Sequence, residues 1–400
     1  MKQILLAGSC LALLMACEAP TETTGTGVED AATTETAAAS TAAPRFGTFG
    51  FDTAGMDTSV APGDDFFAYA NGVWAAETEI PSDRARYGVF DMLSLEVEQQ
   101  VRAIILDASE RGGAPGSNEQ MIGDLFASWM DADTIEARGL EPAMPWLDRI
   151  AAASTFEDVV ALMAERDFHG PYGVGISADP ENPERYIIRS GQGGLGLPDE
   201  AYYREEKHAE TLAAYRAHVE RMLALAGLDE AAARADRVVA LETAIAGHHW
   251  NTVRNRDAQA TYNLATFDEW ATRAAGVDLE RWRDGYGIPP LTLTEVVLRQ
   301  PDVTDGIAAE LTGRHLDEWL DWLRYGIVRS MAPYLSIAFV EESFAFFGRT
   351  LTGAPELRAR WKRGVALVER AMGEAVGATY VERHFKPAAK IAMDDLVENL

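Results

Sequence analysis

The helical spacing of apolar residues from Arg45 onward limits most strongly what this chain can fold into. In residues 89–108 the apolar side chains recur at intervals of four: Val89, Leu93, Val97, Val101 and Ile105. An interval of three or four places side chains on one side of an α-helix. The stretch therefore predicts an amphipathic helix with one buried face.

Four further runs have the same character and predict helices over 200–227, 231–247, 316–331 and 360–385, with Gly227 as a stop for the first. Strand candidates are few and short, chiefly Tyr186–Arg189 and Thr292–Leu298. The last residues, from Lys386 to Leu400, form another amphipathic run, and we expect the chain to stop inside a helix. The body, without an internal repeat or a second linker, is expected to be mainly α.

The charge of the chain excludes one class of partner. Its 400 residues carry 35 basic and 63 acidic side chains, a net charge of -28. Such a chain repels phosphate backbones and anionic lipid surfaces. We therefore expect no nucleic-acid binding.

The first 44 residues read as an export signal and a tether. One lysine, Lys2, precedes a short apolar run, and residues 14–17 (LMAC) resemble the lipobox of bacterial lipoproteins, which predicts lipidation at Cys17. Ordinary cleavage, with Cys17 discarded or free, is the alternative. Residues 18–44 are rich in Thr, Ala and Glu without an aromatic residue, and are expected to be disordered. The predicted organisation is a signal peptide over 1–17, a tether over 18–44 and a folded body over 45–400, exported and anchored to a membrane.

Both cysteines, Cys10 and Cys17, fall in the signal segment, so the body has none and no disulfides are expected. Its stability must come from packing.

A glycine-rich stretch, GQGGLG at 191–196, fits the spacing of a dinucleotide-binding turn and follows a strand-like run. In that fold a helix opens inside the motif and a second strand with an acidic end follows. Here Leu197, Pro198 and Asp199 intervene, and helical patterns follow. A tight turn before a helix capped by Pro198 or Asp199 is the preferred interpretation, with nucleotide binding a distant alternative.

Residue types that carry chemistry form no recognisable constellation. The seven histidines include no H-E-x-x-H pair, and on a helix His248 and His249 would point about 100° apart, so they cannot easily share one metal ion. The run 131–136 (DADTIE) begins like a calcium loop but lacks its glycine, and is interpreted as a helix end with a solvated acidic face. Patterns for serine nucleophiles and phosphate loops are absent.

Five longer stretches, in order along the chain, resemble the neprilysin and endothelin-converting enzyme family of zinc metallopeptidases, specifically its N-terminal region. They are APGDDFFAYANGVW with RYGVFD in 61–101, LFASWMDADTIEARGLEP at 125–142, GQGGLGLPDEAYY at 191–203, HHWNTVRNRDAQATYN in 248–270, and RWKRGVALVERAMGEAVGATYVERHFKPAAK at 360–390. This resemblance makes the glycines of 191–196 a structural turn.

The resemblance implies a mainly α, two-lobed metallopeptidase in which this chain forms the N-terminal helical cap lobe, with few short strands. In the family, zinc is held by H-E-x-x-H and a downstream glutamate on the other lobe, and the substrates are oligopeptides. None of those elements occurs before Leu400. We therefore expect that the chain stops before the zinc motif, contributes no metal ligand and is inactive alone.

One site residue follows from the resemblance, an arginine of the R-Y-G stretch near the substrate channel, which is Arg86 here. A guanidinium at this place is suited to a peptide's terminal carboxylate. The alternative is an arginine at a helix start that pairs with a nearby acid. A second family arginine, eight residues later in some members, is Ser94 here, which weakens the case for a strict preference for free carboxyl termini.

Two functions remain in competition. The leading hypothesis is the N-terminal part of an exported zinc metalloendopeptidase, in which this region caps the substrate cavity. The rival is a non-catalytic, lipid-anchored module that binds peptides or serves as a scaffold.

Overall fold

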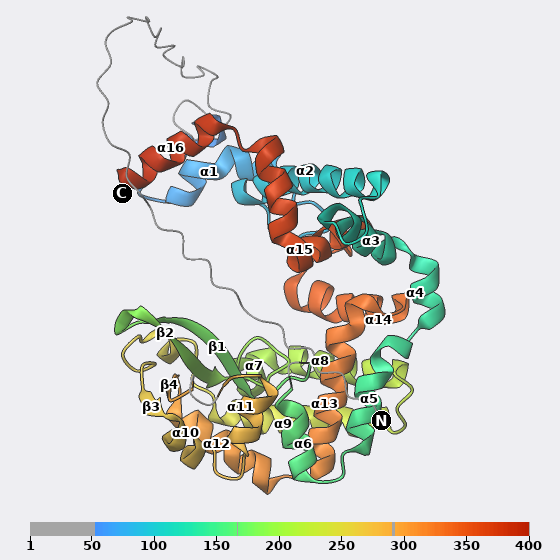
Figure 1. The fold of residues 1–400 in the computed structure, drawn as a ribbon. Coiled ribbons are helices and arrows are strands. Elements are labelled where there is room, and N and C mark those ends of the chain that lie inside the picture. Colours follow the sequence, from blue (N-terminus) through green and yellow to red (C-terminus); the bar gives the residue numbers. More distant parts are fainter. Residues whose placement is uncertain (1–52, 166, 290–292, 400) are drawn as a thin grey trace, which may run out of the picture. The chain divides into compact units, whose positions relative to one another are not determined.

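A computed structural model describes residues 53–165, 167–289 and 293–399 (Figure 1). The predicted signal peptide (1–17) and tether (18–44), with Cys10 and Cys17, lie outside the described residues, as do residues 45–52. The chain divides into two compact units, Met1–Glu79 and Ile80–Leu400.

The described part of the first unit contains one short 3₁₀ turn, Thr53–Gly55, and helix α1 (Phe66–Glu77). Helix α1 begins after Asp65, whose side chain accepts a hydrogen bond from the backbone N–H of Ala68 at 2.9 Å. This is the usual way in which an aspartate satisfies a free amide at a helix start.

The second unit is mainly helical, as the sequence predicts. Its longer helices are α2 (Val89–Arg111), α3 (Asn118–Met130), α8 (Ala209–Leu225), α9 (Ala231–His248), α12 (Pro301–Gly313), α13 (Leu316–Met331), α15 (Arg360–His384) and α16 (Pro387–Glu398). The shorter ones are α4 (Ala132–Arg138), α5 (Met144–Ala152), α6 (Phe156–Met163), α7 (Ala201–Arg204), α10 (Phe267–Arg273), α11 (Leu279–Gly285) and α14 (Ile337–Ser343), which runs into a π-helix (Phe344–Thr350).

The helix predictions agree closely with α9, α13 and α15, each to within one residue at either end. Helix α15 differs from the prediction in one respect, a kink at Met372, where φ is -137°. The prediction over 200–227 is wrong in one respect, because α7 and α8 are separate helices. Glu205 between them is extended, with φ -96° and ψ 130°. Gly227 follows α8 in the left-handed region, at φ +73°, and so acts as the predicted stop. Helix α16 ends at Glu398 with Asn399, still in the right-handed helical region, as its C-cap.

A four-stranded sheet, in the order β1-β2-β4-β3, is built from β1 (Tyr172–Asp179), β2 (Asn182–Gln192), β3 (Leu264–Thr266) and β4 (Glu295–Leu298). Strands β2 and β4 confirm the two predicted strands and pair in parallel, with Ile188 opposite Val296. Strand β1 was not predicted and forms an antiparallel hairpin with β2. Ile188, Val296 and Leu298 pack against α10 and α11, so helices cover that face of the sheet.

The largest core lies among α5, α8, α9 and α13, where Tyr215, Trp319 and Trp322 are almost completely buried. Within it Asp321, also fully buried, accepts hydrogen bonds from three arginines, Arg234, Arg237 and Arg324. A carboxylate in an apolar interior is tolerated only when it is paired in this way.

A separate cluster joins α2, α3 and α15 through Val101, Ile105, Phe126 and Val365. The predicted stripe on α2 is therefore only half buried. Val101 and Ile105 are 3% and 0% exposed, whereas Val89, Leu93 and Val97 are 47%, 38% and 37% exposed. The prediction of one continuous buried face is wrong for the first half of α2, because the cluster formed with α3 and α15 begins only at Val101.

Candidate functional site

Arg86 lies in the extended loop before α2, two residues ahead of the N-cap residue Gly88, and it is exposed. The arginine that pairs with an acid here is Arg84, whose Nη1 lies 2.9 Å from Oδ1 of Asp91. Within the described ranges no hydrogen bond or ion pair engages the Arg86 side chain. The arginine near the start of α2 that binds a nearby acid is therefore Arg84 and not Arg86.

The first turns of α2, which begin shortly after Arg86 in the chain, present an exposed apolar surface. We name it the α2 outer face, made of Phe90, Leu93, Ser94 and Val97. Phe90 is 86% exposed, which is unusual for a side chain of this size. Ser94 donates its hydroxyl to the backbone oxygen of Phe90 at 2.7 Å, so the side chain turns back onto its own helix. A ligand at this surface therefore meets no charged group at position 94, where some family members have a second arginine.

A hollow of about 540 Å³ adjoins the α2 outer face and reaches α15. Charged groups line its other side, where Arg358 pairs with Glu98 of α2. Burial, with the nearby Glu98 charge, raises the pKa of Glu369. Lys362 of α15 donates to Asp83 at 2.6 Å and so holds the loop before α2 against α15. The hollow therefore has an apolar wall on α2 and an ion pair opposite it, a combination of apolar surface and a few placed polar groups that is common in ligand pockets.

Sequence reasoning missed Phe90, although it stands in the same R-Y-G-V-F-D stretch as Arg86. Its place in the apolar pattern gave no signal that the side chain would be exposed. The signal that could have found it was its position, four residues after the candidate Arg86 in the same family motif.

The histidines of α8 and of the end of α9 have separate partners. His248 Nε2 is 2.9 Å from Glu310 Oε1, His249 Nε2 is 3.0 Å from the Gly193 oxygen, and His218 Nδ1 is 2.8 Å from Glu342 Oε1. In the part of the chain that the structure describes, no group of three or more His, Cys, Asp or Glu side chains is arranged to hold a metal ion. The described residues therefore do not fit a zinc site.

The run 131–136 does not form a loop. Asp131 separates α3 from α4 and caps α4 by accepting from the backbone N–H of Thr134 at 3.1 Å. Its carboxylate is used in a helix start, as the preferred interpretation of an acidic helix end implies.

The glycine stretch 191–196 ends β2 and forms a turn, with Gly194 at φ +85°. The hydroxyl oxygen of Tyr203 accepts hydrogen bonds from the backbone N–H groups of Gly196 and Leu197, at 3.1 and 3.0 Å, and donates to Glu242 at 2.6 Å. Amides that would have to bind a phosphate are thus already occupied. The next helix, α7, has only four residues, and Glu200 rather than Pro198 or Asp199 is its N-cap, although Asp199 accepts from the Ala201 amide at 3.0 Å.

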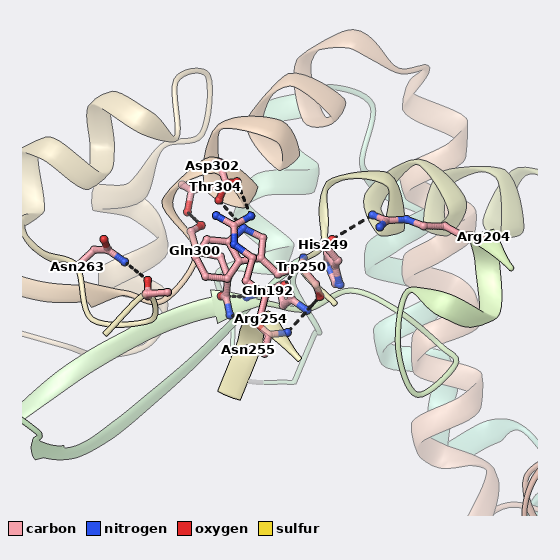
Figure 2. A network of polar contacts seen from close by, with 11 residues as sticks. Gln192, Arg204, His249, Trp250, Arg254, Asn255, Asn263, Gln300, Asp302 and Thr304 are labelled. Carbon is pink, nitrogen blue, oxygen red and sulfur yellow. Dashed lines mark hydrogen bonds and ion pairs between the residues drawn. The ribbon is translucent and has the colours of Figure 1, made fainter. Parts of the chain in front are cut away.

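Figure 2 shows the polar network that fixes the loop after α9. Gln192 of β2 exchanges two hydrogen bonds with the backbone of Trp250, at 2.9 and 3.1 Å. The Trp250 indole donates to Asp302 of α12 at 2.7 Å, and Gln300 donates to Asn255 at 2.8 Å. These groups satisfy one another, so the HHWNTVRN stretch is a scaffold that joins β2, α9 and α12.

A comparison with known families places this architecture. The model for the N-terminal region of peptidase family M13 matches residues 62–400. Endothelin-converting enzyme-like 1 of Mus musculus is 27% identical over 375 residues, covering 88% of this chain and 47% of that protein. A neutral endopeptidase of Lactobacillus helveticus is 24% identical over 359 residues, covering 87% of this chain and 55% of that protein.

Among solved structures, the zinc metalloprotease Zmp1 of Mycobacterium tuberculosis in complex with an inhibitor superposes with a TM-score of 0.83 and 44% identity, over 88% of this chain and 54% of that chain. The class that the fold defines is the mainly helical N-terminal region shared by these relatives. The chain belongs to peptidase family M13. It spans about half the length of the relatives it matches.

Proposed function

We propose that this chain is the N-terminal part of an exported zinc metalloendopeptidase that hydrolyses oligopeptides, and that its α2 outer face lines the substrate cavity. The observation that carries the proposal is the exposed Arg86, unpaired among the described residues and four residues before the nearly fully exposed Phe90. A guanidinium without an internal acid is available for a peptide carboxylate, and the adjacent apolar face suits a hydrophobic side chain.

The zinc ligands are proposed to belong to the part of the relatives that this chain does not match. The 400 residues contain no H-E-x-x-H, and among the described histidines His218, His248 and His249 have polar partners of their own. The chain by itself is therefore expected to be inactive.

The role as a cap over the cavity is supported by exposed apolar side chains on the α2 outer face and on α16. On α16, Ile391, Leu396 and Val397 are 61%, 53% and 65% exposed. Exposed apolar groups on two helices of one unit favour a further protein surface that covers them.

Export and anchoring rest on residues 1–17, with Cys17 as the lipidated residue. Within the described ranges, no helix is both long enough and apolar enough to cross a bilayer. We expect Cys17→Ser to move the protein from the membrane fraction to the soluble fraction of the expressing cells, whereas Cys10→Ser does not. Membrane association that persists in the Cys17→Ser variant would remove the anchor from the proposal.

The peptidase proposal is tested by joining the full chain to the unmatched part of the M. tuberculosis metalloprotease and measuring kcat/KM for a peptide with a free carboxyl terminus and for its amide. We expect Arg86→Ala to lower kcat/KM for the free acid by about tenfold, the value of one charge-assisted hydrogen bond, and to leave the amide unchanged.

Two variants serve as controls. Arg86→Lys keeps the charge without the paired donors and should be intermediate, and Arg281→Ala removes another exposed arginine, on α11, and should have no effect. An equal effect of Arg86→Ala on acid and amide would contradict the role of Arg86, and a chimera that folds but has no chelator-sensitive activity would contradict the peptidase assignment.

The rival function, a lipid-anchored peptide-binding or scaffold module, is favoured by one observation. The described residues of the second unit build three buried clusters of their own. If the isolated chain is monomeric, unfolds cooperatively and binds peptides, while the chimera is inactive, the module is the better account.

A further inference from the structure

Two arginines, Arg189 of β2 and Arg299 directly after β4, stand on the same face of the sheet. In the parallel pair Arg189 is opposite Val297, and Arg299 is two residues beyond Val297. Because side chains alternate along a strand, Arg189, Val297 and Arg299 share one face. The opposite face is the one that α10 and α11 cover through Ile188, Val296 and Leu298.

Neither guanidinium has a counter-charge. Across the described residues no hydrogen bond or ion pair involves the side chain of Arg189 or of Arg299, and the Nε atom of each is shielded from solvent without a partner. Burial, and then the charge of Arg189, lowers the pKa of Arg299, so each cation lies within the other's field. Two neighbouring half-buried cations destabilise a fold unless an anion joins them.

The contrast with other arginines makes this pair unusual. On the same face, Arg185 lies between Asp179 and Glu295, at 2.8 and 2.6 Å. In a chain with 63 acidic residues, carboxylates are abundant. At one end of the face Arg185 therefore has two acidic partners, whereas Arg189 and Arg299 at the other end have none among the described residues.

Glycines leave the sheet surface beside the pair without side chains. On the edge strand β1, Gly175 is opposite Arg189 and Gly173 is opposite Gly191 of β2. A Cβ atom at Gly175 would meet nothing within 4 Å, whereas one at Gly191 would lie 3.4 Å from Cδ of Arg299. The stem of Arg299 thus lies over Gly191, and the way from the edge of β1 to the arginines stays open.

The end of β2 is held firmly next to this surface. Gln300, which Figure 2 shows in the polar network, accepts from the backbone N–H of Gln192 at 3.0 Å, and the backbone N–H of Arg299 donates to Ser190 at 2.8 Å. The backbone on which the two arginines stand is therefore fixed, so a ligand would find it already arranged.

We propose that Arg189 and Arg299 form a carboxylate-binding site on the sheet, and that it takes a carboxylate group of a peptide laid along the free edge of β1. An added strand can pair with the edge, and an acidic side chain or a terminal carboxylate then reaches across Gly173 and Gly175 to the arginines. The peptide as ligand rests on the proposed function, whereas the anion site itself does not.

The test is calorimetric titration of the full chain, which needs no zinc and no peptide cleavage. The probes are a hexapeptide with one central glutamate and an amidated end, its glutamine analogue, the glutamine analogue with a free carboxyl terminus, and inorganic phosphate. We expect saturable binding of a carboxylate peptide, at least about tenfold tighter than the uncharged analogue, and about tenfold weaker in Arg189→Gln and in Arg299→Gln.

The choice of peptides distinguishes a side-chain carboxylate from a terminal carboxylate. Binding of the glutamate peptide assigns a side chain, and binding of the free-terminus peptide assigns the chain end. Arg281→Gln, which removes an exposed arginine elsewhere, should leave binding unchanged. Thermal unfolding checks that the variants are folded. Without ligand, each arginine variant should unfold at the same temperature as the native chain or at a higher one, because one of two neighbouring cations has been removed.

Three outcomes would overturn the proposal: no saturable binding of either carboxylate peptide, binding that both arginine variants retain, or binding of phosphate alone. Activity of the chimera does not enter, so failure here leaves the proposed function untouched. Failure of the proposed function would leave the anion site standing and would remove only the argument that its ligand is a peptide.

Discussion

At the scale of single residues, charge placement separates groups that hold the fold from groups that are free. Asp321 is fully buried and bound by arginines, with Arg237 Nε at 2.7 Å and Arg324 Nη1 at 2.8 Å. Arg86 is exposed and unpaired among the described residues. The arginines around Asp321 hold a buried carboxylate and so stabilise the fold, whereas the exposed guanidinium of Arg86 is available to a ligand.

Replacing Asp321 by asparagine should lower the free energy of unfolding by about 3–5 kcal/mol, because it leaves three arginines around a neutral side chain in the interior. Urea unfolding measures this change. Asp305→Asn, which removes a pair with Arg273 that is 45% and 50% exposed on its two sides, is the matched control and should lose less than about 1 kcal/mol. Similar losses in both variants would contradict the distinction.

The acid stability of the fold should depend on His249. Burial lowers the pKa of His249 to about 4, below its ordinary value of 6.5. The unfolded chain then binds a proton at a higher pH than the folded chain does. Stability from this group is therefore complete above pH 6.5, is lost as the pH falls toward 4, and amounts to about 3 kcal/mol.

His249→Gln keeps a donor for the Gly193 oxygen but cannot take up that proton. Unfolding free energies measured from pH 7 to pH 4 should fall more steeply for the native chain than for this variant. Parallel curves would show that His249 is not the group responsible.

At the scale of elements, helix boundaries follow from local pattern and helix contacts do not. Period and stop signals predicted α9, α13 and α15 closely, because helix formation depends on residues within a few turns. The burial of α2 was predicted only in part. Strand β1 was not predicted, since glycines interrupt its alternation at 173 and 175.

Helix α15 offers two glycines with opposite expectations. A Cβ at Gly364 would lie 2.6 Å from Cδ1 of Trp129 and 2.9 Å from Cε2 of Phe126, both on α3. Gly364→Ala should therefore separate α15 from α3 and destabilise the protein by about 1–3 kcal/mol.

Gly377, on the same helix, has nothing within 4 Å of its Cβ position. Gly377→Ala should stabilise the protein by up to about 1 kcal/mol, since alanine favours the helix. Thermal or urea unfolding of the two variants measures both changes, and a loss in both would indicate that helix α15 tolerates no side chain at either place.

At the scale of the whole molecule, the chain has buried clusters typical of a stable fold but lacks, in the described residues, a cluster of metal ligands. We expect the purified chain to contain much less than one zinc ion per molecule after dialysis and to leave oligopeptides intact. Elemental analysis and a peptide-cleavage assay check both points. Stoichiometric zinc together with activity that a chelator abolishes would contradict the assignment of the zinc site to the unmatched part of the relatives.

The sequence by itself determined the mainly helical body, the positions of most long helices, the structural nature of the 191–196 turn and the family. Each of these depends on residues close together in the chain or on the order of motifs. Only the tertiary structure decided that Arg84 rather than Arg86 is paired, that Phe90 is exposed, and that Arg189 and Arg299 share a face without an acid. For Phe90, Arg189 and Arg299 the reason is physical: burial and ion pairing depend on which distant segments fold against a residue, and Arg189 and Arg299 themselves lie more than a hundred residues apart. Arg84 and Asp91 are only seven residues apart, but their pairing depends on the path of the loop before α2, which the helical pattern does not reveal.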